Sequence, residues 1–147
     1  MKETCLVTGV AGFIGSHLAE RLIKENFDVI GIDSFEDYYS RRMKEDNIKE
    51  LLTAEKFKFI EDNLLYVNLP KILKDVNYIF HMAAQAGVRS SWGDSFSIYT
   101  NNNILATQRL LEAAKDIPIK KFIIASSSSV YGDAKEFPLR EDMIVKP

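Results

Sequence analysis

Cysteine, histidine and tryptophan are scarce in this chain of 147 residues, which holds one Cys, two His and one Trp. The single cysteine, Cys5, excludes an internal disulfide, and it stands in an apolar stretch where it suits the role of a small buried hydrophobe. The two histidines, His17 and His81, are far apart in the sequence, and with one cysteine they give no zinc-site spacing. We therefore expect no metal site, and the cysteine usage fits a reducing compartment.

Long apolar runs and an excess of one charge are also missing. No apolar run reaches the roughly 18 residues of a membrane-spanning helix, and the first residues lack the apolar region of a signal peptide. The net charge of −2 argues against a nucleic-acid or anionic-membrane partner. We expect a cytoplasmic protein, and the length suits one domain covering residues 1–147.

Short apolar stretches alternate with helical patterns along the chain. After Phe13, the residues Ile14, Leu18 and Leu22 recur every four positions, which is the spacing of an amphipathic helix. The expected strands are Thr4–Thr8, Val29–Ile32, Phe57–Ile60, Tyr78–Met82 and Lys121–Ala125. The expected helices are Phe13–Asn26, Tyr38–Ala54, Pro70–Leu73 and Asp94–Ala114. This alternation predicts the α/β class, with a Rossmann-type doubly wound parallel sheet and helices on both faces.

A glycine-rich turn, TGVAGFIG, joins the first expected strand to the first helix. Its glycines, Gly9, Gly12 and Gly15, permit a tight turn and a close approach of backbone to a pyrophosphate. The N–H groups at the start of the following helix favour negative charge there. A purely structural turn is the alternative, and the absence of a following Lys-Ser or Lys-Thr disfavours a P-loop NTPase.

An acidic residue ends the second expected strand. Asp33 stands 18 residues after Gly15, close to the spacing at which a carboxylate accepts hydrogen bonds from the adenosine ribose hydroxyls. Its charge would repel a 2′-phosphate, so NAD is preferred over NADP. The alternative is a loop aspartate in a turn with Ser34.

Several stretches resemble the extended short-chain dehydrogenase/reductase superfamily, in its NAD-dependent nucleotide-sugar epimerase/dehydratase branch. They are VTGVAGFIGSHLAERL, GIDSF, FHMAAQAGVRSSW, YTNNNILATQRLLEAA and ASSSSVYGD, in family order over the whole chain. They are most similar to UDP-sugar 4-epimerases of the UDP-glucose and UDP-glucuronate types. The resemblance implies an NAD cofactor, a nucleotide-sugar substrate, transient oxidation at C4 and return of the hydride to the opposite face. It also implies a homodimer formed through the helix Asp94–Ala114.

The resemblance assigns roles to individual residues. The cofactor-binding residues it implies are Gly9, Gly12, Phe13, Ile14, Gly15, Asp33, Asp62, Asn63, Leu64, Ala83, Ala84, Asn103 and Ser126. The family has Asp-Leu or Asp-Ile where this chain has Asn63-Leu64, which leaves open whether Asn63 or Asp62 accepts from the adenine amino group. The family motif Asn-x-x-Gly-Thr begins at Asn103 and has Ala106 in place of its glycine.

Four serines follow the fifth expected strand. By the resemblance, Ser127 is the catalytic residue, because the family's serine or threonine at this position hydrogen-bonds the sugar hydroxyl that is oxidised. A serine-rich turn that caps the strand is the alternative. The substrate-side candidates are Gln85, Arg89 and Ser128. By the same resemblance, nucleotide-sugar 4,6-dehydratases have Thr-Asp-Glu at the position where this chain has Ser127-Ser128-Ser129. This difference favours an epimerase over a dehydratase. A UDP-glucuronate decarboxylase stays open.

Tyr131 and Lys135 have the Tyr-x-x-x-Lys spacing of the family's proton-transfer pair. We do not interpret them as that pair, because Tyr131 lies only four residues after Ser127 and Gly132-Asp133 is a poor helix start. The closing VKP resembles the segment just before the true motif. We therefore expect an NAD-binding part without the Tyr-x-x-x-Lys helix and the C-terminal substrate domain, inactive alone. A non-catalytic dinucleotide-binding module is the alternative.

Overall fold

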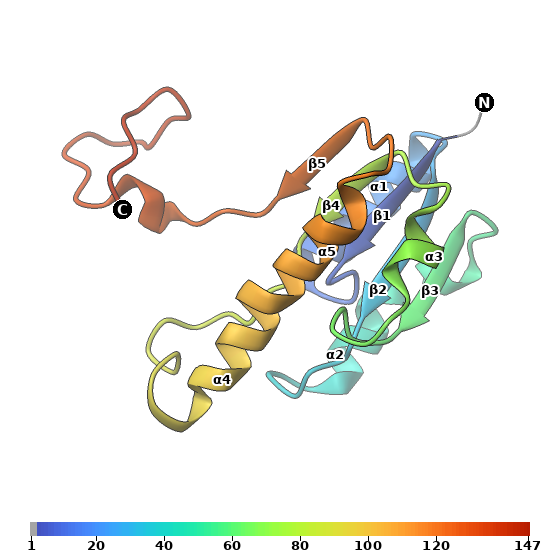
Figure 1. Cartoon of the computed structure of the whole chain (residues 1–147), viewed down its shortest axis with the longest axis horizontal. Helices are drawn as coiled ribbons and strands as arrows, with labels where there is room; N and C mark the ends of the chain where they lie inside the picture. Colours follow the sequence, from blue (N-terminus) through green and yellow to red (C-terminus); the bar gives the residue numbers. More distant parts are fainter. Residues whose placement is uncertain (1–2) are drawn as a thin grey trace.

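The most buried strand, β1, lies in the middle of a five-stranded sheet in the computed structural model, which describes residues 3–147 (Figure 1). The strands are β1 (Thr4–Thr8), β2 (Asp28–Asp33), β3 (Phe57–Glu61), β4 (Tyr78–His81) and β5 (Lys121–Ile124). Their order is β3-β2-β1-β4-β5 and every pair is parallel. All five carboxyl ends therefore meet at one edge, and the strand order reverses between β1 and β4.

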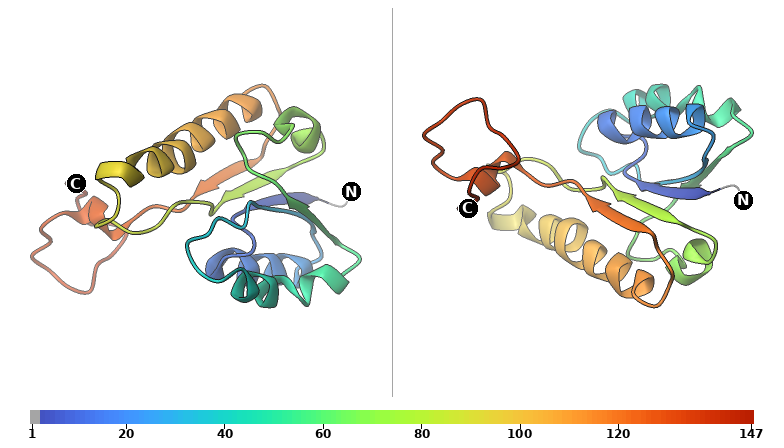
Figure 2. Two further views of the ribbon diagram at one scale, coloured as in Figure 1. Left: turned by 90° about the horizontal axis from the view of Figure 1, so that it is seen from below. Right: turned by 90° about the horizontal axis from the view of Figure 1, so that it is seen from above.

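Helices cover both faces of the sheet, as Figure 2 shows from two sides. The α-helices are α1 (Phe13–Lys24), α2 (Arg41–Ile48), α3 (Leu69–Leu73), α4 (Phe96–Tyr99) and α5 (Ala106–Ala114). In Figure 2, α1 and α2 lie on one face, and α3 lies with the α4–α5 stack on the other. The predicted doubly wound α/β fold is confirmed.

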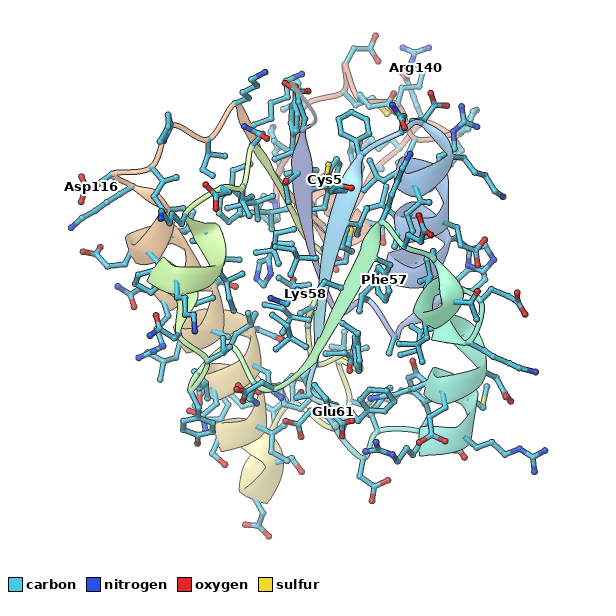
Figure 3. The ribbon with its side chains drawn as sticks, turned by 90° about the vertical axis from the view of Figure 1, so that its right-hand side faces the viewer. Cys5, Phe57, Lys58, Glu61, Asp116 and Arg140 are labelled. Carbon is cyan, nitrogen blue, oxygen red and sulfur yellow. The ribbon has the colours of Figure 1, made fainter. Side chains whose placement is uncertain are left out.

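Two apolar cores follow from this layering. One joins Leu6 and Ile79 of the sheet to Leu73 of α3 and Leu110 of α5. The other lies against α1 and α2, and it buries Cys5, which is 1% exposed. Alternation along β3 divides its side chains between the two layers, so that Phe57 faces α1 and α2 and Lys58 lies on the opposite side (Figure 3).

Two of the expected helices differ from those in the structure. The segment expected to be helical over Tyr38–Ala54 is a loop up to Ser40, then α2, then a 3₁₀ turn at Leu51–Thr53. Ile48 and Leu51 are buried, but Leu52 is 56% exposed, because the helix ends before it and its side chain turns to solvent.

The hydrogen-bonding pattern changes several times along the expected helix Asp94–Ala114. It begins with a 3₁₀ turn at Gly93–Ser95, continues as α4, changes to π-helical bonding over Thr100–Leu105 and ends as α5. A π-helical turn is rare and frequently marks a functional region. Beyond β5 the chain runs away from the sheet to a 3₁₀ turn at Ser128–Tyr131 (Figure 1).

Within residues 3–147, the structure holds no helix with the length and apolar character needed to cross a membrane.

Replacing Leu110 with alanine tests the core between α5 and the sheet. Leu110 is fully buried, so Leu110→Ala should lower the free energy of unfolding by about 2–5 kcal/mol through lost burial and a residual cavity. The matched control is Leu111→Ala, one position along the same helix at a side chain that is 44% exposed, with a loss below about 1 kcal/mol. Urea unfolding measures both, and equal losses would contradict the packing.

Candidate dinucleotide-binding site

A cavity of about 540 Å³ opens at the carboxyl ends of the strands. Its volume lies within the usual range of small-molecule and cofactor sites, roughly 300–1,000 Å³. The expected residues that line it are Gly9, Gly12, Phe13, Ile14, Gly15, Asp33, Asp62, Asn63, Leu64, Ala83, Ala84 and Gln85. The structure therefore brings together the glycine turn, Asp33 and the segments that follow β3 and β4.

The glycine turn is built by backbone contacts that leave no room for side chains. Gly9 has φ +67°, and a Cβ there would lie 2.8 Å from the backbone of Ala83. A Cβ at Gly15 would lie 2.2 Å from the carbonyl oxygen of Gly9. The glycines are required because the start of α1, the end of β1 and the β4 loop approach one another at the point where the strand order reverses.

The N-terminus of α1 faces this cavity without a side-chain cap. Its N-cap residue is Gly12, no acidic residue stands in its first turn, and Ser16 N–H donates to the Gly12 carbonyl at 3.0 Å. Phe13, Ile14 and Gly15 line the cavity and occupy the positions whose N–H groups have no partner inside a helix. This end of the helix is therefore suited to an anionic group.

Asp33 joins the glycine turn to the loop after β2. Its Oδ2 accepts from the Ala11 N–H at 3.0 Å and its Oδ1 accepts from the Phe35 N–H at 2.9 Å. A carboxylate has about four acceptor positions, so Asp33 keeps capacity for further donors. The structure thus contains both the turn predicted as the alternative and a carboxylate at the cavity, although the turn partner is Phe35 rather than Ser34.

The β2–α2 loop, residues 34–40, closes one side of the cavity and was not predicted as part of the site. Tyr38 and Tyr39 line it, together with Lys44 and Asn47 of α2. The Asn47 amide donates to the Ala11 carbonyl at 2.9 Å, which ties α2 to the glycine turn. Burial, and then the Asp33 charge, raise the pKa of Tyr39.

Lys44 is the one lysine or arginine among the described residues that line the cavity. It is only 5% exposed, and its Nζ donates to the Glu36 carbonyl at 2.6 Å and lies 4.9 Å from the Tyr39 ring centroid. Its role is therefore to hold the β2–α2 loop in place. The signal in the sequence is its spacing, since Lys44 precedes Ile48 and Leu51 by four and seven residues on the same helical face.

Threonine and histidine side chains fix the loop after β4 from behind. His81 is 3% exposed, and its Nδ1 lies 2.7 Å from Thr8 Oγ1 and its Nε2 lies 2.9 Å from Thr107 Oγ1. Thr8 Oγ1 accepts from the Ala83 N–H at 3.2 Å, and the Thr107 hydroxyl donates to the Asn103 carbonyl at 2.8 Å. Because the Thr107 hydroxyl already donates, Nε2 carries a proton and donates it to Thr107 Oγ1, and His81 serves to hold the loop after β4.

Asn103 lies next to the cavity lining, in the π-helical segment. Its Oδ1 accepts from the Gln85 N–H at 2.7 Å and its Nδ2 donates to the Gln85 carbonyl at 3.1 Å. Its neighbour Asn102 lines the cavity, as does Ala106. Asn103 therefore positions the β4 loop through Gln85.

The remaining expected residues lie outside the cavity lining: Arg89, Ser126, Ser127 and Ser128. Ala125 lines the cavity, so the serine segment begins at its margin. Ser127 Oγ accepts from the Ser129 N–H at 3.2 Å and so caps the 3₁₀ turn, which is the structural role considered as the alternative. Tyr131 and Lys135 do not share a helix, because the 3₁₀ turn ends at Tyr131 and Gly132 has φ +54°.

Residues 3–147 contain no group of three or more His, Cys, Asp or Glu placed to hold a metal ion.

Comparison with known proteins identifies the family. The model of the GDP-mannose 4,6-dehydratase family matches residues 6–147. The chain belongs to this family. It is an NAD-dependent nucleotide-sugar epimerase/dehydratase family, as the resemblance implied.

The relatives in this family include several 4-epimerases. The chain is 49% identical over 143 residues to an uncharacterized UDP-glucose epimerase, YtcB, of Bacillus subtilis, covering 97% of this chain and 45% of the relative. The crystal structure of UDP-glucuronic acid 4-epimerase from Bacillus cereus with UDP-glucuronic acid and NAD has a TM-score of 0.89 at 46% identity, covering 98% of this chain and 46% of that one. UDP-N-acetylglucosamine 4-epimerase from Methanobrevibacter ruminantium has a TM-score of 0.80 at 37% identity, covering 100% and 45%. The chain thus spans less than half the length of these relatives.

Adding a methyl group at Gly15 tests the glycine turn. Gly15→Ala should lower the free energy of unfolding by about 1–3 kcal/mol, because the new Cβ meets backbone that cannot move without displacing β1 or α1. The matched control is Gly12→Ala, whose Cβ meets the Gly9 oxygen at 3.2 Å and should cost less. Denaturant unfolding of the two variants would contradict the geometry if Gly12→Ala proved the more damaging.

Acid should weaken the fold through His81. Burial lowers the pKa of His81 below its ordinary value of 6.5, so the unfolded chain takes up the proton first. The free energy of unfolding should be constant with respect to this group above that value and should fall as the pH drops from it toward the folded-state pKa, by at most about 1.4 kcal/mol per pH unit. Urea unfolding at a series of pH values measures the slope. His81→Gln should remove that part of it, whereas His17→Gln, at the exposed histidine, should keep it.

Proposed function

We propose that this chain binds NAD in the cavity between the glycine turn and the β2–α2 loop. The observation that carries the proposal is that the uncapped N-terminus of α1 and the Asp33 carboxylate face one cavity where the strand order reverses. A pyrophosphate suits the helix N-terminus, and ribose hydroxyls suit a carboxylate with free acceptor positions. The lack of room for a Cβ at Gly9 and Gly15 shows how closely the start of α1, the end of β1 and the β4 loop pack, and this packing places the helix N-terminus at the cavity.

In this proposal each part of the chain has a binding role. The backbone of Phe13, Ile14 and Gly15 holds the pyrophosphate, and Asp33 accepts from the adenosine ribose. Ala83 and Ala84 lie beside the nicotinamide ribose, and the hydrogen bonds of Thr8, His81 and Thr107 hold this segment in place. NAD, when bound, supplies hydride transfer, and the protein supplies binding and orientation.

We further propose that the whole protein is a UDP-sugar 4-epimerase. The relatives named as 4-epimerases support this, including one crystallised with UDP-glucuronic acid and NAD. In this role Ser127 would orient the reacting sugar hydroxyl, with Ser126 toward the cofactor. Ser128, Gln85 and Arg89 would face the substrate. The 147 residues alone would bind NAD without turnover.

Two other features of the whole protein are proposed on narrower grounds. A homodimer through the α4–α5 stack is supported by exposed apolar side chains on it, such as Phe96, Ile104 and Leu111. A cytoplasmic location rests on the sequence alone.

The reaction that competes with 4-epimerisation is 4,6-dehydration, because the family is described by that activity. Decarboxylation of the sugar is a second competing reaction.

Titration calorimetry with NAD and NADP tests the proposed site. NAD should bind, and NADP should bind at least about tenfold more weakly, because Asp33 opposes a 2′-phosphate. Asp33→Asn should narrow that difference. Absence of NAD binding, or a preference for NADP, would contradict the proposal.

A turnover assay with NAD and UDP-glucuronate or UDP-glucose tests the reaction. The gene's full reading frame should convert the sugar to its C4 epimer, seen by nuclear magnetic resonance. Release of water would instead indicate a dehydratase, and release of carbon dioxide a decarboxylase. NAD binding with no reaction by the full product would favour a non-catalytic binding module.

A further inference from the structure

The adenosine end of the cavity lies between the loops that follow β2 and β3. Asp33 ends β2, and a carboxylate there accepts from the adenosine ribose. The next strand outward is β3, whose carboxyl end is marked by Glu61 in Figure 3. A base attached to that ribose therefore lies against the residues after β3 and the β2–α2 loop, where Glu36, Asp62 and Asn63 line the cavity.

Hydrogen bonds on both ends of Asn63 fix the orientation of its side-chain amide. Its Oδ1 accepts from the Leu65 N–H at 2.9 Å, and its Nδ2 donates to Glu36 Oε1 at 3.1 Å. A backbone N–H can bond only to the oxygen, and a carboxylate can bond only to the nitrogen, so the reverse orientation would break both bonds. The Asn63 oxygen, one of the two candidate acceptors for the adenine amino group, is thus turned to the backbone of Leu65, and the amide presents its nitrogen toward Glu36.

The acceptor next to this amide is the carboxylate of Glu36. Asn63 holds it from the β3 side at 3.1 Å, and the Ser34 hydroxyl donates to the same Oε1 from the β2 side at 3.4 Å. Among the described residues no hydrogen bond is made to Glu36 Oε2. Glu36 therefore offers a held carboxylate with a free oxygen in the cavity, at the point where the two loops meet.

We infer that Glu36, positioned by Asn63, accepts a hydrogen bond from the exocyclic amino group of adenine and selects a 6-amino purine over a 6-oxo purine. The inference rests on the proposed NAD site. A 6-amino group donates to a carboxylate, whereas a 6-oxo group directs lone pairs at it. Asp62 is the competing acceptor, but the bond that its Oδ1 accepts, from the Asn63 N–H at 2.7 Å, comes from its own neighbour in the chain, whereas the Asn63 side chain holds Glu36 from across the β3 loop.

The test compares NAD with nicotinamide hypoxanthine dinucleotide, which carries a 6-oxo purine, by titration calorimetry on the 147-residue chain. The wild type should bind NAD at least about tenfold more tightly, the lower range for a hydrogen bond to a charged group. Glu36→Gln should bring the ratio close to one, because a carboxamide can donate to the 6-oxo group. The matched control Asp37→Asn makes the same change of charge one residue away, outside the cavity lining, and should keep the wild-type ratio.

A second variant restores a carboxylate on the other side of the pair. Asn63→Asp combined with Glu36→Gln exchanges the two groups and should recover most of the preference for NAD. The inference is overturned if Glu36→Gln leaves the ratio unchanged, if Asp62→Asn removes the preference instead, or if the wild type prefers the 6-oxo analogue. Failure of the wild type to bind either dinucleotide would overturn the proposed site itself, which distinguishes the two failures.

Discussion

Backbone-to-backbone contact at the reversal of strand order is the constraint on which the rest of this site depends. Gly9 lies against the backbone of Ala83, and Gly15 lies against the carbonyl of Gly9, with no space for a Cβ at either glycine. Since each of these residues carries only hydrogen at that point, the first turn of α1 can lie directly beyond β1 and beside the β4 loop. The free N–H groups of the helix then face a cavity instead of a side chain.

Asp33 closes the same turn from the β2 side. One carboxylate accepts from Ala11 in the glycine turn and from Phe35 in the β2–α2 loop, so the charge that would discriminate between dinucleotides also shapes the loop. Hydrogen bonds also fix the loop after β4. His81 bonds to Thr8 and Thr107, and the Asn103 side chain accepts from the Gln85 N–H. The walls of the cavity are thus held by polar contacts on their outer side, which leaves their inner side for a ligand.

The sequence predicts those parts of this arrangement that depend on local spacing. Alternating apolar segments indicate the parallel sheet, and the glycine spacing with Asp33 indicates the cavity. Lys44 and Tyr39 were missed because their position depends on how the β2–α2 loop folds back, which is a tertiary contact. Asn63 shows a finer limit: its identity can be read from the sequence, but which end of its amide faces Glu36 is decided by the Leu65 N–H.

The charges around the cavity indicate how a dinucleotide would be recognised. Asp33, Glu36 and Asp62 make the lining acidic, and Lys44 is turned to the Glu36 carbonyl and the Tyr39 ring. A ligand with a diphosphate must therefore be held mainly by the backbone dipoles of the glycine turn and α1, which act at short range. The backbone would thus attract the diphosphate, whereas the carboxylates would select among dinucleotides by accepting from hydroxyl and amino groups and by repelling an added phosphate.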